Sequence, residues 1–262
     1  MHQAPPLPQM RTSSPELVRV LDRICFQLDD LYRDSDDYAE FTWFAREYPR
    51  CYRYHLDCAE YRLRGIHSLF LKIREALAPK VTESPALFEA SISDLRVQRI
   101  YWDFESYLSE VNIALDLLAR VAGTAYAQPM PLNFNKFCKK EGDCGPLGIM
   151  KRAQERWVKR LKDYRDCLTH YTPVDTLLSV GLIQYSDGFQ IRARLPVNPN
   201  VRDILGFKFT RRVELLRYAF CVWRHMTALD RAVAREIARA FAKGDYPKRT
   251  SNLFFLGRRE RE

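Results

Sequence analysis

Apolar side chains recur at steps of three and four residues over much of the chain, which is the period of one face of an α-helix. The clearest series are Tyr52, Leu56, Ala59, Leu63, Ile66, Phe70, Ile73 and Leu77, and then Val97, Tyr101, Phe104, Leu108, Val111, Leu115, Leu118 and Ala122. The first series predicts a helix that starts after Pro49 and ends at Pro79, and the second predicts a helix that stops near Gly123. We expect both apolar faces to pack in the core.

Three more helices are predicted from their boundaries. Residues 14–16 (Ser-Pro-Glu) supply an N-cap, a proline at the first helical position and an early acid, so a helix should run from there to about Tyr32. The stretch 128–148 is rich in proline and glycine and predicts a surface loop, after which helix resumes near Leu147. The last helix should begin at about Thr210.

From Asp175 the period of the apolar positions changes. Residues 177–185 are rich in apolar and β-branched side chains, and the Ser-Asp-Gly at 186–188 is typical of a turn. Apolar residues then alternate with polar ones at Phe189, Ile191, Ala193 and Leu195. This pattern predicts a β-hairpin over about 177–195, which must pack on helices to be stable. The expected fold is mainly α, an antiparallel helical bundle with one inserted β-hairpin.

Length and composition agree with one helical domain. The chain has 262 residues, of which 47% are hydrophobic, and only 10 Gly and 14 Pro. We expect a disordered lead over 1–14, which lacks the apolar centre of a signal peptide, a single domain over 15–245, and a tail over 246–262. Because no apolar run is long enough to span a bilayer, we expect no membrane span and a cytoplasmic location.

The seven cysteines form no CxxC pair and are odd in number, which excludes a disulfide framework and a zinc ligand set. Cys138 and Cys144 share a polar stretch and are a weak candidate for a metal half-site or a redox pair, because no second pair of ligands accompanies them. We therefore expect no metal and no cofactor.

The formal net charge of +9 favours acidic partners, of which nucleic acid is the commonest and an anionic membrane surface the next, although solubility alone is a simpler interpretation. The charge is concentrated within 151–165, where seven basic side chains stand against Glu155 and Asp163. The candidates for contacts with RNA phosphates are Arg156, Lys159, Arg160 and Lys162.

This basic stretch leads into the one segment with candidate chemistry, where Arg165 is followed five residues later by His170. The same spacing occurs at Arg50/His55 and Arg62/His67, but those two histidines lie about 50° and 70° from the centre of an apolar helical face and should flank the core. His170 lies about 135° from the centre of its own helix's apolar face and should be exposed. That apolar face is Trp157, Leu161, Tyr164, Leu168 and Tyr171.

The residue types suit metal-independent RNA cleavage. A histidine can take the proton of a ribose 2′-hydroxyl or protonate the leaving oxygen, and an arginine can hold the phosphate while negative charge builds on it. Asp166, four residues before His170, could hydrogen-bond its imidazole. On a regular α-helix Arg165 lies about 140° from His170, so the two converge only if the helix end distorts or a second chain completes the site. Pro173 makes such a distortion reasonable.

A helical bundle in which Arg165, a polar Asp166, three residues and His170 follow one another resembles the Arg-x4-His signature of the HEPN superfamily. The resemblance implies a homodimer with two Arg/His pairs in one cleft and a ribonuclease of toxin–antitoxin or antiviral systems, with a cognate antitoxin or regulatory protein as partner. Arg165 would bind the phosphate, His170 would be the acid/base, and Asp166 stands where Asn is often found. Tyr171 directly follows His170, whereas the nucleotidylated Tyr of some members lies one position further on, so we count Tyr171 with the RNA-binding residues.

Three other interpretations stay open. HEPN domains without catalysis serve as RNA- or protein-binding regulatory modules. The basic helix could bind an anionic surface. Arg165 could also be a surface residue paired with Asp163 or Asp166, with His170 merely ending a helix.

Overall fold

The computed structural model describes residues 14–32, 38–82, 89–92, 95–125, 133–171, 180–185, 188–202 and 204–244. Within these ranges the protein is mainly helical, as predicted, and it also contains a small antiparallel sheet. The expected tail over 246–262 lies outside the described residues, as does the expected lead apart from Ser14. Along the described ranges, every helix is too short or too polar to cross a lipid bilayer.

The contacts divide the chain into two compact units. Unit 1 comprises 1–10, 58–110 and 159–224, and unit 2 comprises 11–57, 111–158 and 225–262. Three long helices contribute residues to both units. The prediction of a single domain over 15–245 stays a prediction, and the two units are described separately below.

The helices that the sequence predicts are present, with several different bounds. They are α1 (Glu16–Tyr32), α2 (Tyr38–Thr82), α3 (Leu95–Ala125), α5 (Gly145–Ala153), α6 (Lys159–Asp166) and α8 (Leu215–Lys243). Helix α2 neither starts after Pro49 nor ends at Pro79, so both of these predictions were wrong. Proline removes one hydrogen bond and crowds the preceding turn, a local cost that burial of a long apolar face outweighs. Helix α3 likewise continues two residues past Gly123.

The predicted loop over 128–148 contains a short helix, α4 (Phe134–Cys138), and that part of the prediction was wrong. Asn133 caps it, its side chain accepting the N–H of Lys136 at 2.8 Å, and Asp116 of α3 accepts the N–H of Phe134 at 2.8 Å. Five residues cannot form a stable helix by propensity alone. The caps and the burial of Phe134 and Phe137 provide the missing stabilisation.

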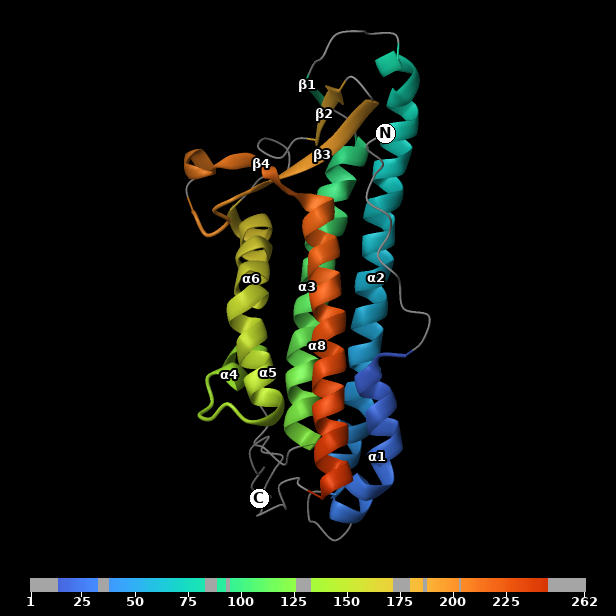
Figure 1. Cartoon of the computed structure of the whole chain (residues 1–262), viewed down its shortest axis with the longest axis vertical. Helices are drawn as coiled ribbons and strands as arrows, with labels where there is room; N and C mark the ends of the chain where they lie inside the picture. Colours follow the sequence, from blue (N-terminus) through green and yellow to red (C-terminus); the bar gives the residue numbers. More distant parts are fainter. Residues whose placement is uncertain are drawn as a thin grey trace, which may run out of the picture. The chain divides into compact units, whose positions relative to one another are not determined.

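Unit 1 holds the sheet, whose four strands follow the order β1-β2-β3-β4 with antiparallel neighbours (Figure 1). They are β1 (Glu89–Ile92), β2 (Val180–Tyr185), β3 (Gly188–Pro196) and β4 (Phe209–Glu214). Strands β2 and β3 confirm the predicted hairpin, with Val180 opposite Ala193, while residues 177–179 and the turn residues 186–187 lie outside the described residues. Strands β1 and β4 were not predicted. The last helix therefore begins at Leu215 and not at Thr210.

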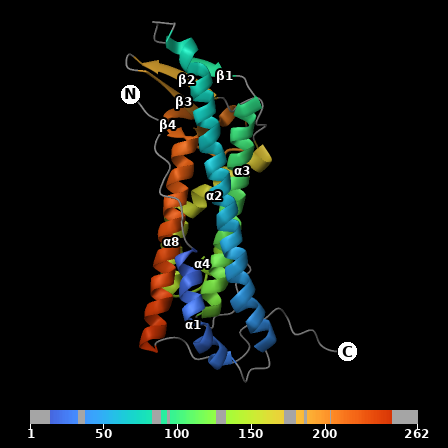
Figure 2. The ribbon, with the colours of Figure 1, turned by 90° about the vertical axis from the view of Figure 1, so that its right-hand side faces the viewer.

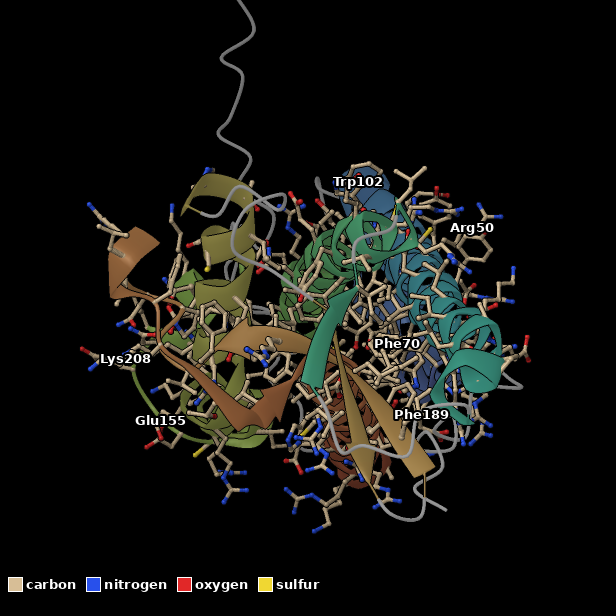
Figure 3. The ribbon with its side chains drawn as sticks, turned by 90° about the horizontal axis from the view of Figure 1, so that it is seen from above. Arg50, Phe70, Trp102, Glu155, Phe189 and Lys208 are labelled. Atoms are coloured by element: carbon tan, nitrogen blue, oxygen red, sulfur yellow. The ribbon has the colours of Figure 1, made fainter. Side chains whose placement is uncertain are left out.

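Hydroxyl groups of buried tyrosines connect the helices of unit 1 to its sheet and to α8. Tyr101 and Tyr107 of α3 donate to the carbonyl oxygens of Arg194 and Ala219, each at 3.0 Å. Tyr164 of α6 donates to the carbonyl of Pro196 at 2.7 Å. Apolar side chains fill the space around them, and Figure 3 shows one of them, Phe70 of α2, in the interior. These bonds satisfy polar groups that burial would otherwise penalise.

Unit 2 packs α1 beside the C-terminal part of α8 (Figure 2). Asp230 of α8 is 5% exposed, and its carboxylate accepts the N–H of Glu16 at 2.8 Å and of Leu17 at 3.4 Å. The hydroxyl of Tyr52 also donates to this carboxylate, at 3.0 Å. The first N–H groups of α1 therefore go to a side chain more than two hundred residues away, where the sequence predicted Ser14 as the cap.

Candidate functional site

The predicted angles of Arg165 and His170 are those of one regular α-helix. The helical run that carries the candidate site is not regular. Two π-helical turns interrupt it, η1 (Gln154–Val158) before α6 and η2 (Cys167–Tyr171) after it. The predicted apolar face is nevertheless buried at Trp157, Leu161, Tyr164 and Leu168. The side chain of Tyr171 lies outside the described residues.

His170 is exposed on η2, as predicted, and Arg165 and Asp166 are partly exposed at the end of α6. A π turn closes its hydrogen bonds over five residues instead of four. Side chains five residues apart therefore point in more similar directions than they do on an α-helix. The hydroxyl of Thr169 donates to the carbonyl oxygen of Arg165 at 2.7 Å, a contact that competes with regular helical bonding. The helix end is thus distorted between Arg165 and His170, the condition that the sequence analysis set for their convergence within one chain.

Asp166 pairs with Arg165, which is one of the two ion pairs that the sequence left open for this arginine. Its Oδ1 accepts Nη2 of Arg165 at 2.6 Å and Nε at 3.0 Å, and the orientation of His170 by its carboxylate stays a prediction. Both side chains are partly exposed, and a pair of this kind contributes only roughly 0.2–1 kcal/mol. A phosphate group with its own negative charge can replace the carboxylate at the guanidinium.

The predicted phosphate-binding side chains have different surroundings. Lys159 is exposed and Lys162 is partly exposed in unit 1, while Arg156 is exposed in unit 2. Arg160 is exposed, but its Nη2 donates to the hydroxyl of Tyr164 at 3.3 Å and its guanidinium lies 5.6 Å from the centre of that ring. Burial raises the pKa of Tyr164, and the hydrogen bond from Arg160 opposes this rise. Arg160 therefore also supports a buried tyrosine, which its sequence position did not indicate.

The two other Arg-x4-His pairs lie in the regular helix α2 and differ from the candidate pair. His67 is buried, with its ring 5.9 Å from that of Phe220, and Arg62 pairs with Asp103 at 3.0 Å. His55 is partly exposed and contacts the ring of Tyr54 edge-on. Both histidines flank the core, as predicted. Among the three pairs, an exposed histidine on a π turn distinguishes Arg165/His170.

A small recess in the sheet of unit 1 was not predicted. Arg192 and Arg194 of β3 and Glu214 of β4 line it, and its volume of about 10 Å³ holds no more than one water. Burial raises the pKa of Glu214. The N–H groups of Arg217 and Leu216 donate to its carboxylate and oppose this rise. The only feature of the sequence that bears on this recess is the pair of arginines on one face of the predicted second strand.

Among the described residues, no further metal ligands are grouped with the two cysteines that the sequence singled out. Cys138 is partly exposed and Cys144 is exposed at the N-cap of α5. Across the part of the chain that the structure describes, no three or more His, Cys, Asp and Glu side chains are grouped so that they could hold a metal ion.

Fold and candidate site together define a mainly helical protein with a small antiparallel sheet and an exposed histidine on a distorted helix end. No family model, curated protein or solved structure matches the chain. The functional assignment therefore depends on the chemistry of the chain's own residues.

Proposed function

We propose that this protein is a metal-independent endoribonuclease of the HEPN type, with Arg165 and His170 as its catalytic residues. The observation that carries the proposal is the π turn η2. It follows the partly exposed Arg165 of α6 and contains the exposed His170, five residues later. π turns of this kind are frequent at functional sites, because they displace side chains from regular helical positions.

The proposed reaction is a transesterification within the RNA backbone. His170 accepts the proton of a ribose 2′-hydroxyl, the 2′-oxygen forms a bond to phosphorus, and the bond from phosphorus to the 5′-oxygen breaks. The leaving oxygen takes a proton, which gives a 2′,3′-cyclic phosphate and a free 5′-hydroxyl. Arg165 binds the phosphate through its guanidinium and stabilises the charge that develops there.

Asp166 holds the guanidinium of Arg165 before substrate binds. When the phosphate binds, Arg165 exchanges the carboxylate for the phosphate oxygens. Asp166 stays beside Arg165 as a second contact for the N–H groups of the guanidinium. Lys159, Lys162 and Arg160 provide salt-sensitive attraction to the RNA backbone in the same unit.

The remaining features of the proposal follow the HEPN resemblance. The protein forms a helical bundle that acts as a homodimer, so that two copies of the Arg165/His170 pair share one cleft. Its setting is a cytoplasmic toxin–antitoxin or antiviral system, with RNA as substrate and a cognate antitoxin or regulatory protein as inhibitor.

The test is cleavage of total RNA in the presence of EDTA by the purified protein and by its His170→Ala and Arg165→Ala variants. The Arg50→Ala/His55→Ala double variant is a matched control, because it alters a pair of identical spacing on a regular helix. We expect cleavage by the unaltered protein and the control, and a loss of at least about a hundredfold in each site variant. Equal rates in all four proteins would refute the assignment of the site.

One observation favours a second candidate, a non-catalytic RNA- or protein-binding module. Arg165 is already paired with Asp166, as in a surface ion pair without a catalytic role. This candidate predicts that the unaltered protein cleaves no RNA in the same assay but binds RNA or a protein tightly. Its RNA binding would depend on Lys159 and Lys162 and not on His170.

A further inference from the structure

Helix α8 carries a row of arginines on its outer side. Arg224, Arg231 and Arg235 are exposed, and they lie within about 40° of one another around the helix axis, over a length of about 16 Å. The buried side chains of Leu229 and Val233 point to the opposite side. Because all of these residues belong to one continuous helix (Figure 1), the alignment of the arginines depends on α8 alone.

The side chains between the arginines are small. Ala228 and Ala242 are exposed on the same line, and none of the large apolar side chains that are exposed among the described residues belongs to α8. This surface therefore offers positive charge without an apolar anchor. We call Arg224, Ala228, Arg231, Arg235 and Ala242 the α8 arginine row.

The acids of α8 lie away from the row. They are Asp230 and Glu236, each about 120° from the centre of the row. Asp230 is buried and accepts N–H groups of α1, and Glu236 pairs with Arg239 at 2.6 Å. Arg217 is not counted in the row, because it lies near Glu214 at the start of the helix. The three arginines of the row have no ion-pair partner among the described residues.

Helix α1, which packs beside the C-terminal part of α8 in unit 2, does not offset this charge with its described side chains. Glu16 pairs with Arg19, and the exposed Asp22 is followed by the exposed Arg23. These two acids and two bases balance one another. The described side chains of α1 thus leave the net positive charge of the row unchanged.

The neighbour on another side of α8 adds positive charge. The ring of His225 stacks on Trp157 of η1, with 5.8 Å between the ring centres, so η1 lies beside α8 in unit 2. Glu155 of η1 is exposed, and the exposed Arg156 and Arg152 accompany it. Two cations against one acid leave this neighbour with a net charge of the same sign as the row.

We propose that the α8 arginine row binds the phosphate backbone of RNA, on a different helix from Arg165 and His170. A guanidinium binds a phosphate through two N–H groups at once, and cations in a line can follow a chain of phosphates. The alanines between the arginines allow the backbone to approach the helix closely. Since the row contacts phosphates and no bases, its binding is independent of RNA sequence.

The composition of the row selects RNA over the other acidic partners. Protein–protein interfaces have an apolar centre that is enriched in aromatic residues, whereas the row has only alanine between its charges. Helices that bind membrane surfaces insert Trp, Phe or Leu, and basic lipid-binding segments carry about four to eight cations, which is more than the three of the row. A second copy of the row would be repelled, because its charges have the same sign.

The identity of the ligand as RNA rests on the proposed function, whereas the test measures binding and not cleavage. Labelled single-stranded oligouridylate is titrated at several salt concentrations with full-length His170→Ala protein, with and without Arg231→Ala/Arg235→Ala, and fluorescence anisotropy gives the dissociation constants. We expect the arginine variant to bind roughly tenfold more weakly at low salt. The slope of log affinity against log salt should fall by about 1.4, since each phosphate contact to a single strand contributes about 0.7.

Two further variants are matched controls. Arg231→Lys/Arg235→Lys keeps both charges and should keep the salt slope of the parent. Lys72→Ala/Arg99→Ala also removes two exposed cations that have no ion-pair partner among the described residues, but these cations are on two different helices and form no row. Its affinity should equal that of the parent, and circular dichroism should show the parent's helix content for every variant.

Unchanged affinity and salt slope in Arg231→Ala/Arg235→Ala would overturn the inference, and so would an equal loss in Lys72→Ala/Arg99→Ala. Binding of polyglutamate that is tighter than binding of RNA and depends on Arg231 and Arg235 would overturn it in favour of an acidic protein. Failure of the proposed function looks different, because RNA would then stay uncleaved by the unaltered protein while its binding still depended on these two arginines.

Discussion

Asp230 shows how much a single buried side chain can contribute in unit 2. Its carboxylate accepts two N–H groups from the first turn of α1 and the hydroxyl of Tyr52. Asp230→Ala leaves two buried donors and one partly buried donor without their acceptor, so we expect the free energy of unfolding to fall by about 3 kcal/mol. Urea denaturation followed by circular dichroism measures this loss.

The control for this prediction is Asp57→Ala on α2. Asp57 is exposed, and its carboxylate is 3.7 Å from Arg53. Removal of such a surface pair should change the free energy of unfolding by less than about 0.5 kcal/mol. If both variants lost the same amount, Asp230 would not be the cap of α1.

The buried tyrosines of unit 1 predict a loss of stability in alkali. Burial raises the pKa of Tyr101 and of Tyr107 well above the ordinary tyrosine value of 10.0. Their contribution is fully present below pH 10, and it is lost above that pH because the unfolded chain releases phenolic protons that the folded chain retains. Each tyrosine should lower the free energy of unfolding by about 1.4 kcal/mol per pH unit above 10.

Denaturant unfolding at a series of alkaline pH values, with tyrosinate absorbance as a second probe, checks this slope. The Tyr101→Phe and Tyr107→Phe variants have one fewer group to ionise and should show a shallower slope than the parent. An unchanged slope in both variants would locate the alkaline loss in other groups.

At the scale of single residues, the sequence predicted exposure better than it predicted partners. The angle of His170 from its apolar neighbours was enough to place it on the surface, because that angle depends only on helical periodicity. The partners of Asp166 and Asp230 could not be predicted in the same way. Asp166 had both Arg165 and His170 within reach, and Asp230 bonds residues more than two hundred positions away.

Two glycines within helices allow a test of packing at the scale of the element. Alanine normally stabilises a helix interior by about 1 kcal/mol over glycine. In α5, however, a Cβ on Gly148 would overlap the backbone carbonyl of Asp143, which cannot move without displacing the loop that it belongs to. Gly148→Ala should therefore lower the free energy of unfolding by about 2 kcal/mol or more.

Gly65 of α2 is the matched case. A Cβ there would lie 3.6 Å from a carboxylate oxygen of Asp103, which is an ordinary contact. Gly65→Ala should raise the free energy of unfolding by about 0.5–1 kcal/mol, in the direction opposite to Gly148→Ala. Thermal and urea denaturation of the two variants, compared with the parent, would show the opposite signs; a shared sign would contradict the packing at Gly148.

Long elements were predicted more successfully than short ones. The long helices were found because eight apolar residues in register leave little ambiguity, and the β2–β3 hairpin was found because a turn signal separates its strands. Strand β1 has four residues and pairs with β2 about ninety positions later, so nothing local marks it. Neither π turn was predicted, because propensities describe regular helices. Thr169 within the second π turn and Pro173 just after it are the nearest sequence signals.

At the scale of the whole molecule, the proposed reaction needs one group to accept a proton and another to donate one. Among the described histidines, His67 is buried, His55 flanks the core, and His225 is exposed but lies in unit 2, where it stacks on Trp157. His170 is therefore the histidine of unit 1 that is exposed to substrate. Within the proposed mechanism, a second His170 from another copy of the chain is the natural source of the second proton transfer.

This requirement predicts that activity depends on association of two chains. Initial rates measured over a dilution series should give a specific activity that falls about tenfold for each tenfold dilution below the dimer dissociation constant, which sedimentation equilibrium measures independently. Excess His170→Ala protein should inhibit the unaltered protein, because it draws active chains into mixed dimers with one histidine. Excess Arg50→Ala/His55→Ala protein should not inhibit. A specific activity that stays constant on dilution, with no inhibition by His170→Ala chains, would mean that His170 acts within a single chain and that its proton partner is a group other than a second histidine.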